Sequence, residues 1–139
     1  MKQIDKKYSS HYGILLLEDE PLMNDLLVHY CHGLPFSVDL KTYQDPLSAL
    51  RDPRLDSHSI HLMLVDILLP DMNAYEFLEN VKTRTGDDFP KIIAITAIAN
   101  DQLVFRLKQD FQVRFLRKPF KKQDLLDLVG HVLGYAHAS

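Results

Sequence analysis

Five short apolar runs alternate with five amphipathic stretches along this sequence, and this alternation constrains the fold more than any other feature. Each run is too short for a typical helix, and most are rich in Ile, Val, Leu or aromatic residues, which favours strands. The first, third and fourth runs are apolar almost throughout, as in parallel strands that are covered on both faces. The runs span residues 13–17, 38–43, 61–65, 91–95 and 113–117.

The stretches between the runs carry helix patterns. From Met23, apolar residues recur at i, i+3, i+4 and i+7, and Pro21 stands at a suitable first helical position. Polar residues and glycines mark starts or ends of the four later helices. These markers are Asp45, Gly86, Asn100 or Asp101, and Gly134.

Strand–helix alternation with short connections predicts an α/β fold: a doubly wound, five-stranded parallel sheet with right-handed crossovers and helices on both faces. The 139 residues fit one domain. We expect this domain to span residues 13–136 and residues 1–12 to form a flexible extension, because chain termini are often disordered unless other residues hold them. In sheets of this kind, functional groups gather in the crevice at the carboxyl ends of the strands.

The composition argues against several classes of function. The net charge is −3 and no basic run occurs, so we expect neither a nucleic-acid partner nor a membrane surface. No apolar stretch is long enough to span a bilayer, and residues 1–12 lack the apolar core of a secretion signal. The single cysteine, Cys31, cannot form an intrachain disulfide. We therefore expect a protein of a reducing compartment, the cytoplasm.

Polar residues follow four of the predicted strands. Each has an ordinary interpretation by itself: acidic residues after a strand are usually solvated, a threonine suits a strand, and a lysine is usually a surface charge. In a parallel sheet these strand ends share one edge, so we expect acidic groups, a hydroxyl and an ammonium to converge there. The residues are Glu18, Asp19 and Glu20 after the first strand, Asp66 after the third, Thr96 and Ala97 after the fourth, and Lys118 and Pro119 after the fifth.

Asp66 has the surroundings of a nucleophile. It follows four apolar residues, so its carboxylate lies near a low-dielectric sheet end beside Glu18 and Asp19, and such crowded carboxylates resist ionising together. A hard cation such as Mg²⁺ resolves this conflict, because it prefers oxygen ligands. An ionised aspartate can attack phosphorus to give an acyl phosphate, while the cation and Lys118 neutralise the phosphoryl oxygens. This edge of the sheet therefore suits phosphoryl transfer.

Four motifs stand at the predicted strand ends: LLLEDEP at 15–21, LVDILLPDM at 64–72, AITA at 94–97 and FLRKPF at 115–120. In this order and at this spacing they closely resemble the receiver domains of two-component response regulators. The resemblance runs from about residue 13 to residue 133. It implies a flavodoxin-like (βα)5 fold with strand order 2-1-3-4-5 and a receiver domain over residues 13–136.

The resemblance implies a cation site made of oxygen ligands. Asp66 is identified as the phosphoacceptor and as a ligand of Mg²⁺ or Mn²⁺. Asp19 is expected to bind the ion directly and Glu18 mainly through water. The backbone carbonyl of Leu68 is expected to be a further ligand.

The resemblance also implies which groups hold the phosphoryl group. The hydroxyl of Thr96 and the backbone N–H of Ala97 are expected to donate to its oxygens, and Lys118 is expected to pair with it. The peptide between Lys118 and Pro119 is usually cis in this family. Phe115 matches the aromatic residue that swings inward when the threonine moves, although by itself it also fits plain core packing.

These implied roles describe a signalling switch that is not an enzyme beyond its own phosphotransfer and dephosphorylation. The phosphoryl donor is expected to be a phosphohistidine on a sensor histidine kinase or a histidine phosphotransfer protein. The signal is expected to leave through the face of the fourth helix, fifth strand and fifth helix. Because the chain ends soon after the fifth predicted helix, we expect the output to be binding of a downstream protein target or passage of phosphate in a relay. The resemblance also admits a phosphorylation-dependent dimer.

Three alternatives stay open. The chain can be a pseudo-receiver that binds partners without phosphorylation, although Asp66, Asp19, Thr96 and Lys118 are all present. It can also be a receiver domain excised from a larger hybrid kinase or regulator. The third, a small doubly wound phosphatase or haloacid-type hydrolase, is the least favoured, because such enzymes carry a second aspartate two residues after the nucleophile, where this sequence has Leu68.

The sequence departs from the family pattern in three places. Residues 73–74 are Asn-Ala where Asp-Gly is frequent, and residues 109–112 lack the Gly-Ala that commonly precedes the fifth strand. The positions two beyond the acceptor and two beyond the threonine are both apolar, Leu68 and Ile98. Neither side chain can orient a water molecule by hydrogen bonding, so we expect a long-lived phosphoaspartate.

Overall fold

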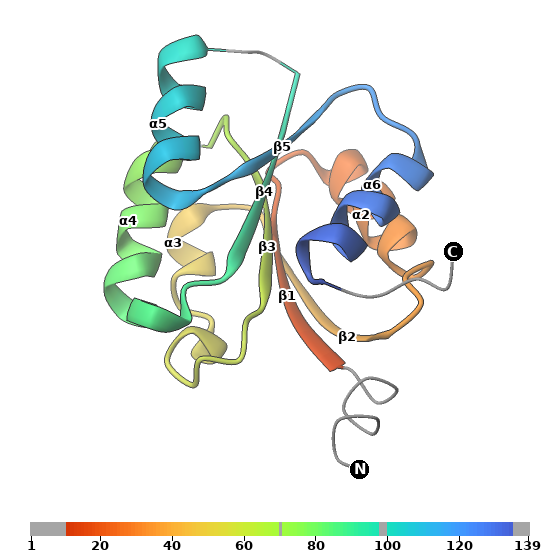
Figure 1. Cartoon of the computed structure of the whole chain (residues 1–139), viewed down its shortest axis with the longest axis horizontal. Helices are drawn as coiled ribbons and strands as arrows, with labels where there is room; N and C mark the ends of the chain where they lie inside the picture. The colour runs from red at the N-terminus through yellow and green to blue at the C-terminus, as the bar shows by residue number, and fades with distance from the viewer. Residues whose placement is uncertain (1–10, 70, 98–99, 135–139) are drawn as a thin grey trace.

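The computed structural model describes residues 11–69, 71–97 and 100–134. In these residues five parallel strands form one sheet in the order β2-β1-β3-β4-β5, with helices on both of its faces (Figure 1). This arrangement confirms the predicted doubly wound sheet and its strand order. The strands are β1 (His11–Leu17), β2 (Ser37–Tyr43), β3 (Leu62–Asp66), β4 (Lys91–Thr96) and β5 (Arg114–Arg117).

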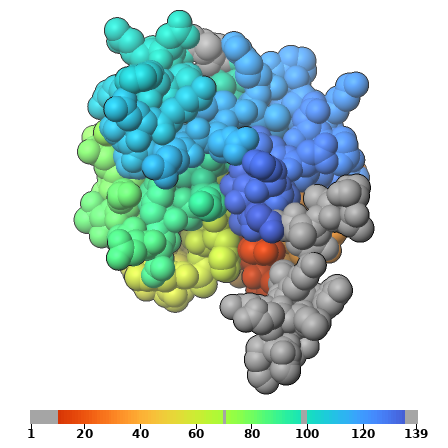
Figure 2. Space-filling view, in the orientation of Figure 1, coloured from red at the N-terminus to blue at the C-terminus, as the bar shows by residue number. Residues whose placement is uncertain are grey.

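The described part of the chain has five α-helices and two short 3₁₀-helices, which lie between strands except for the last helix, α6, which follows β5. The helices α2 and α6 lie on one face of the sheet, and α3, α4 and α5 lie on the other (Figure 1). On the outside of the molecule, α5, β5 and α6 form one continuous surface (Figure 2). The helices are α2 (Pro21–Cys31), α3 (Pro46–Ala49), η1 (Pro53–Leu55), α4 (Ala74–Thr85), η2 (Gly86–Asp88), α5 (Asp101–Phe111) and α6 (Lys122–Val132).

Successive strand residues point to opposite faces of the sheet and so divide the core into two clusters. In β1, Leu15 and Leu17 belong to the apolar cluster that includes residues of α3, α4 and α5. Ile14 and Leu16 belong to the cluster that includes residues of α2 and α6. All four are fully buried. Because helices cover both faces, the central strands are apolar along their whole length, which is the pattern seen in the sequence.

The sequence favours the starts of α3 and α5, and side-chain caps begin these two helices and also α4. Asp45 accepts a hydrogen bond from the backbone N–H of Ser48 at 2.8 Å and caps α3. Asn100 accepts one from Leu103 at 3.0 Å and caps α5. Asn73, one of the departures from the family pattern, caps α4 by accepting from Glu76 at 2.8 Å. Each cap satisfies an N–H that has no partner within its helix.

The turn before β5 keeps a left-handed residue although it has no glycine. Gln112 ends α5 at φ 55° and ψ 40°, and its backbone N–H donates to the carbonyl groups of Leu107 and Lys108. A side chain in this conformation costs about 1–2 kcal/mol more than glycine does. α5 therefore ends in the left-handed conformation that is common at helix ends, although glutamine adopts this conformation less readily than glycine.

The amino-terminal boundary differs from the sequence-based expectation. His11 and Tyr12, placed in the expected extension, belong to β1 and pair with Ser37 and Val38 of β2. The ring of Tyr12 also contacts the ring of Phe36, with 4.8 Å between centroids. Aromatic packing and strand pairing thus hold these two residues. Residues 1–10 and 135–136 lie outside the described residues.

Among the described residues, each helix is too short or too polar to cross a bilayer.

Candidate functional site

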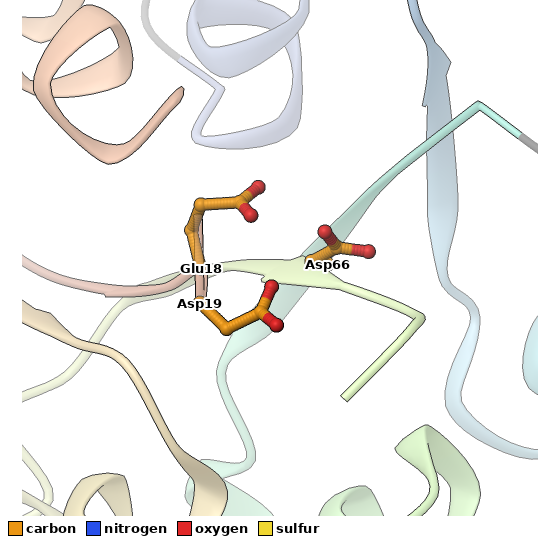
Figure 3. Close-up of side chains that lie close together, drawn as sticks. All are labelled: Glu18, Asp19 and Asp66. Carbon is orange, nitrogen blue, oxygen red and sulfur yellow. The ribbon is translucent and has the colours of Figure 1, made fainter. Parts of the chain in front are cut away.

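Three carboxylates meet at the carboxyl edge of the sheet. Glu18 and Asp19 follow β1, and Asp66 ends the neighbouring parallel strand β3, where Leu17 pairs with Val65. Each of the three residues offers an oxygen, and these oxygens lie within 4.8 Å of one another (Figure 3). Glu18 and Asp66 are buried, whereas Asp19 is exposed. The structure therefore brings together three of the four acidic residues that the sequence singled out, all except Glu20.

Asp66 is held at both of its carboxylate oxygens. Its Oδ1 accepts a hydrogen bond from the backbone N–H of Leu68 at 2.9 Å. Its Oδ2 lies 3.4 Å from Nζ of Lys118. The residue is 7% exposed, so little of its surface is accessible to solvent.

Glu18 is the most strongly perturbed group of the site. Burial raises its pKa to about 7, and the negative charge of Asp66 adds to the rise, while the N–H of Glu20 and the charge of Lys118 oppose it. Its Oε2 accepts from the N–H of Glu20 at 3.1 Å. Its Oε1 is buried and has no hydrogen-bond partner among the described residues, although Nζ of Lys118 lies 3.5 Å away.

A buried acceptor without a hydrogen bond is unfavourable and calls for a partner. Three carboxylates within reach of one another form an all-oxygen donor set, which a hard divalent cation such as Mg²⁺ prefers. A water molecule bound to such a cation would give Oε1 of Glu18 the hydrogen-bond donor that it lacks. The cation itself would supply the positive charge that the crowded carboxylates need. The residues present therefore fit a magnesium site.

Lys118 enters the site from the connection after β5. Its backbone N–H donates to the carbonyl of Thr96 at 2.8 Å, which fixes this connection to the end of β4. The peptide between Lys118 and Pro119 is cis, as the family resemblance implies. The Nζ atom of Lys118 is within 3.5 Å of oxygens of both Glu18 and Asp66. One ammonium thus faces two buried carboxylates.

Thr96 ends β4, which pairs with β3 so that Asp66 lies opposite Ile95, and Ala97 follows it. Thr96 is buried and Ala97 is exposed. Phe115 lies in β5 and pairs with Ala94 of β4. Its side chain is half-buried and packs against the apolar cluster that includes residues of α4 and α5. The ammonium of Lys108 lies 5.7 Å from the centre of the Phe115 ring. These positions suit the roles expected for the three residues, which stay predictions.

The side chain of Leu68 is exposed (56% for the residue), although its backbone N–H donates to the carboxylate of Asp66. Ile98, the second apolar position noted in the sequence, lies outside the described residues.

Two residues have functions here that the sequence-based interpretation did not assign. Glu20 caps α2 by accepting from the N–H of Met23 at 2.9 Å, and it is not among the three clustered carboxylates. Asn24, on the buried side of α2, donates from Nδ2 to the backbone carbonyl of Glu18 at 3.3 Å. The signal for Asn24 was available, because a polar residue stands three positions before Leu27 on an otherwise apolar helix face.

Comparisons with known proteins agree with this architecture. A family model described as the response regulator receiver domain matches residues 14–130. The peroxide stress-activated histidine kinase mak1 of Schizosaccharomyces pombe is 25% identical over 134 residues, which cover 94% of this chain and 8% of that protein. The transcriptional regulatory protein CssR of Bacillus subtilis is 28% identical over 122 residues, which cover 88% of this chain and 51% of that protein. The chain thus spans a small part of one relative and about half of the other.

Solved structures show the same fold. The chemotaxis protein CheY4 of Vibrio cholerae superimposes with a TM-score of 0.75 at 20% identity, over 88% of this chain and 99% of that one. A CheY-like receiver domain protein from Methanospirillum hungatei gives a TM-score of 0.72 at 25% identity, over 90% and 95% of the two chains. With the family match over residues 14–130, the chain belongs to the response regulator receiver domains of two-component signalling.

Proposed function

We propose that this receiver domain is a phosphorylation-controlled switch in which Asp66 accepts a phosphoryl group. The donor is a phosphohistidine on a sensor histidine kinase or a histidine phosphotransfer protein. The single observation that supports this most is the setting of Asp66. It is 7% exposed, its carboxylate lies within the cluster formed with Glu18 and Asp19, and its Oδ2 is 3.4 Å from Nζ of Lys118.

In the proposed reaction, a carboxylate oxygen of Asp66 attacks phosphorus and forms the new P–O bond. The P–N bond of the donor breaks, and its electron pair goes to the imidazole nitrogen. No protein base is needed, because the nucleophile is a carboxylate, whose oxygen supplies the electron pair of the new bond without losing a proton. Lys118 places a positive charge beside Oδ2 of this carboxylate. Asp19, Asp66 and the Leu68 carbonyl, with Glu18 mainly through water, would hold Mg²⁺ or Mn²⁺, and the ion would supply further charge neutralisation.

Thr96 and Ala97 provide the proposed link from the site to the surface. The Thr96 hydroxyl and the Ala97 N–H donate to the phosphoryl oxygens only when that group is present, so they can favour one conformation over another. Thr96 pairs with Arg117 in the β4–β5 ladder, and Phe115 lies two residues before Arg117. A movement at Thr96 thus reaches the surface of α5, β5 and α6, where a downstream protein is proposed to bind. A phosphorylation-dependent dimer through this surface stays a prediction.

The switch is tested by amide NMR shifts on addition of beryllofluoride and Mg²⁺, which imitate the phosphoryl group. We expect shifts at the site and also along α5, β5 and α6, with the largest remote change near Phe115. The Asp66→Asn variant is the matched control and should show neither set. Shifts confined to the residues around Asp66 would show that the site is occupied without any switch.

We expect the phosphoaspartate to be long-lived. Its hydrolysis needs a water molecule aligned opposite the leaving carboxylate, and polar side chains beside the site can align it. Leu68 cannot do so, and the same is true of Ile98 by its side-chain chemistry. The Leu68→Asn/Ile98→Glu double variant should lose its phosphoryl group about tenfold faster, because positioning a reactant is worth at least that much. The check is the decay of phosphoprotein in Mg²⁺ buffer, and equal decay rates for the two proteins would contradict the expectation.

A further inference from the structure

Asn24 is a polar residue in an apolar position. It lies on the inner side of α2, where the buried residues are Asn24, Leu27 and Cys31. Asn24 itself is 7% exposed. Asparagine forms helices poorly, and a buried amide is unfavourable unless its polar atoms find partners. A leucine at this position would suit the helix and the core better, so stability of α2 does not account for the asparagine.

The partner of Asn24 is the backbone of the acidic turn. Its Nδ2 donates to the carbonyl oxygen of Glu18 at 3.3 Å. The same residue, Glu18, donates its backbone N–H to the carbonyl of Tyr43 at 3.0 Å and accepts at Oε2 from Glu20 at 3.1 Å. Glu18 is thus held from the β2 side, from its own turn, and from α2 through Asn24.

The carbonyl of Glu18 belongs to the peptide that leads to Asp19. Because the six atoms of a peptide unit lie close to one plane, fixing the direction of this carbonyl also fixes where the Cα atom of Asp19 lies within that plane. The carboxylate of Asp19 is exposed and depends on this backbone position for its place beside Asp66 (Figure 3). The hydrogen bond from Asn24 to the Glu18 carbonyl, on the buried side of α2, therefore helps to set the position of the exposed Asp19 carboxylate.

We propose that Asn24 is a positioning residue of the cation site: through the Glu18 carbonyl it holds the peptide between Glu18 and Asp19 so that the Asp19 carboxylate faces Asp66. This inference rests on the proposed function, because it concerns the same site. Asn24 touches neither the ion nor the phosphoryl group in this role. Its loss should weaken binding of Mg²⁺ while leaving the chemistry at Asp66 intact.

The test is Mg²⁺ binding by the Asn24→Leu variant, followed by amide NMR titration with MgCl₂ and no phosphoryl donor. Leucine fills a similar volume but cannot donate to the carbonyl of Glu18. We expect the dissociation constant for Mg²⁺ to rise about fivefold, the usual worth of one intramolecular hydrogen bond. Asn24→Ala also lacks the donor and should change the constant in the same direction. Phosphorylation by acetyl phosphate should approach the wild-type rate at saturating Mg²⁺, because only ion affinity is impaired.

Cys31→Ala is the matched control. Cys31 is buried on the same side of α2, two turns further along, and its described contacts do not include Glu18. This variant should lower the unfolding temperature without changing the affinity for Mg²⁺. Unchanged affinity in both Asn24 variants overturns the inference, and so does an equal rise in the Cys31→Ala protein, which would indicate general loosening of α2. If the wild-type protein itself binds no Mg²⁺ beside Asp66, the proposed function fails and the inference fails with it.

Discussion

Replacing Arg54 with Met is expected to lower the free energy of unfolding by about 3–5 kcal/mol, the range for breaking a buried ion pair by removing one partner. Asp52 is 1% exposed and Arg54 is 8% exposed. The guanidinium Nη2 lies 2.8 Å from Oδ2 of Asp52, and its Nε also donates to that carboxylate. Methionine keeps most of the side-chain volume, so the loss reports the charge and its hydrogen bonds rather than packing.

Arg54 also joins three segments of the chain. Its Nη1 donates to the backbone carbonyl of Asp39 in β2 at 2.6 Å, and its Nη2 donates to the carbonyl of Ile14 in β1 at 3.2 Å. The hydroxyl of Tyr43 also donates to the carboxylate of Asp52, at 2.9 Å from Oδ2. Asp52, Arg54 and Tyr43 thus form one polar cluster. Without the guanidinium, a buried carboxylate and two backbone carbonyls lose a donor together. This accounts for an effect larger than that of an exposed ion pair.

The contribution of this cluster depends on pH in a defined direction. Burial raises the pKa of Asp52, but the hydrogen bonds from Arg54 and Tyr43 outweigh burial and hold that pKa below its ordinary value. A carboxyl group with a lowered pKa stabilises the folded state above its unfolded-state pKa of about 4. That stabilisation is lost as the pH falls through the lower folded-state value. The wild-type protein should therefore keep the full contribution at neutral pH.

Urea unfolding at neutral pH measures the change, with the slope compared between proteins to confirm the same unfolding transition. The Asp52→Asn/Arg54→Met double variant is the control, because it removes both buried charges and leaves no buried carboxylate without a partner; the Asp39 carboxylate, which also pairs with Arg54, is partly exposed. It should be more stable than Arg54→Met alone. A single variant that loses less than about 1 kcal/mol would place this pair among ordinary surface ion pairs and contradict the account.

The sheet and the site were predictable for one shared reason. The apolar runs fix the central strands, and parallel strands joined by helices bring their carboxyl ends to one edge. Glu18 and Asp66 are far apart in the sequence, yet the pairing of β1 with β3 places them together. The family resemblance added the strand order and the expected roles, which the clustered oxygens suit but do not by themselves establish.

The Asp52–Arg54 cluster was not predictable in the same way. In the sequence, residues 51–56 read RDPRLD, which is typical of a charged surface loop. Both side chains are buried because the segment after α3 folds back against β1 and β2, and this depends on tertiary contacts rather than on local pattern. Gln112 is a milder case. The sequence showed that the usual glycine is missing, but only the backbone shows that glutamine adopts the left-handed conformation itself.

Replacing Asp66 with Asn is expected to abolish phosphorylation completely. The amide has nearly the shape of the carboxylate but no ionised oxygen, so it cannot form the acyl phosphate. The fold should persist, because the amide oxygen can still accept from the N–H of Leu68. Removing one of three crowded carboxylates also relieves repulsion with Glu18 and Asp19. The loss of reaction will therefore report the chemistry of one side chain rather than unfolding.

The measurement that tests this most directly is the intact mass of wild-type and Asp66→Asn protein after incubation with acetyl phosphate and Mg²⁺. The account predicts that the wild-type protein gains the mass of one phosphoryl group, that removal of the cation with a chelator suppresses the gain, and that the variant gains none. Equal phosphorylation of the two proteins would place the acceptor at another residue and contradict the central role of Asp66.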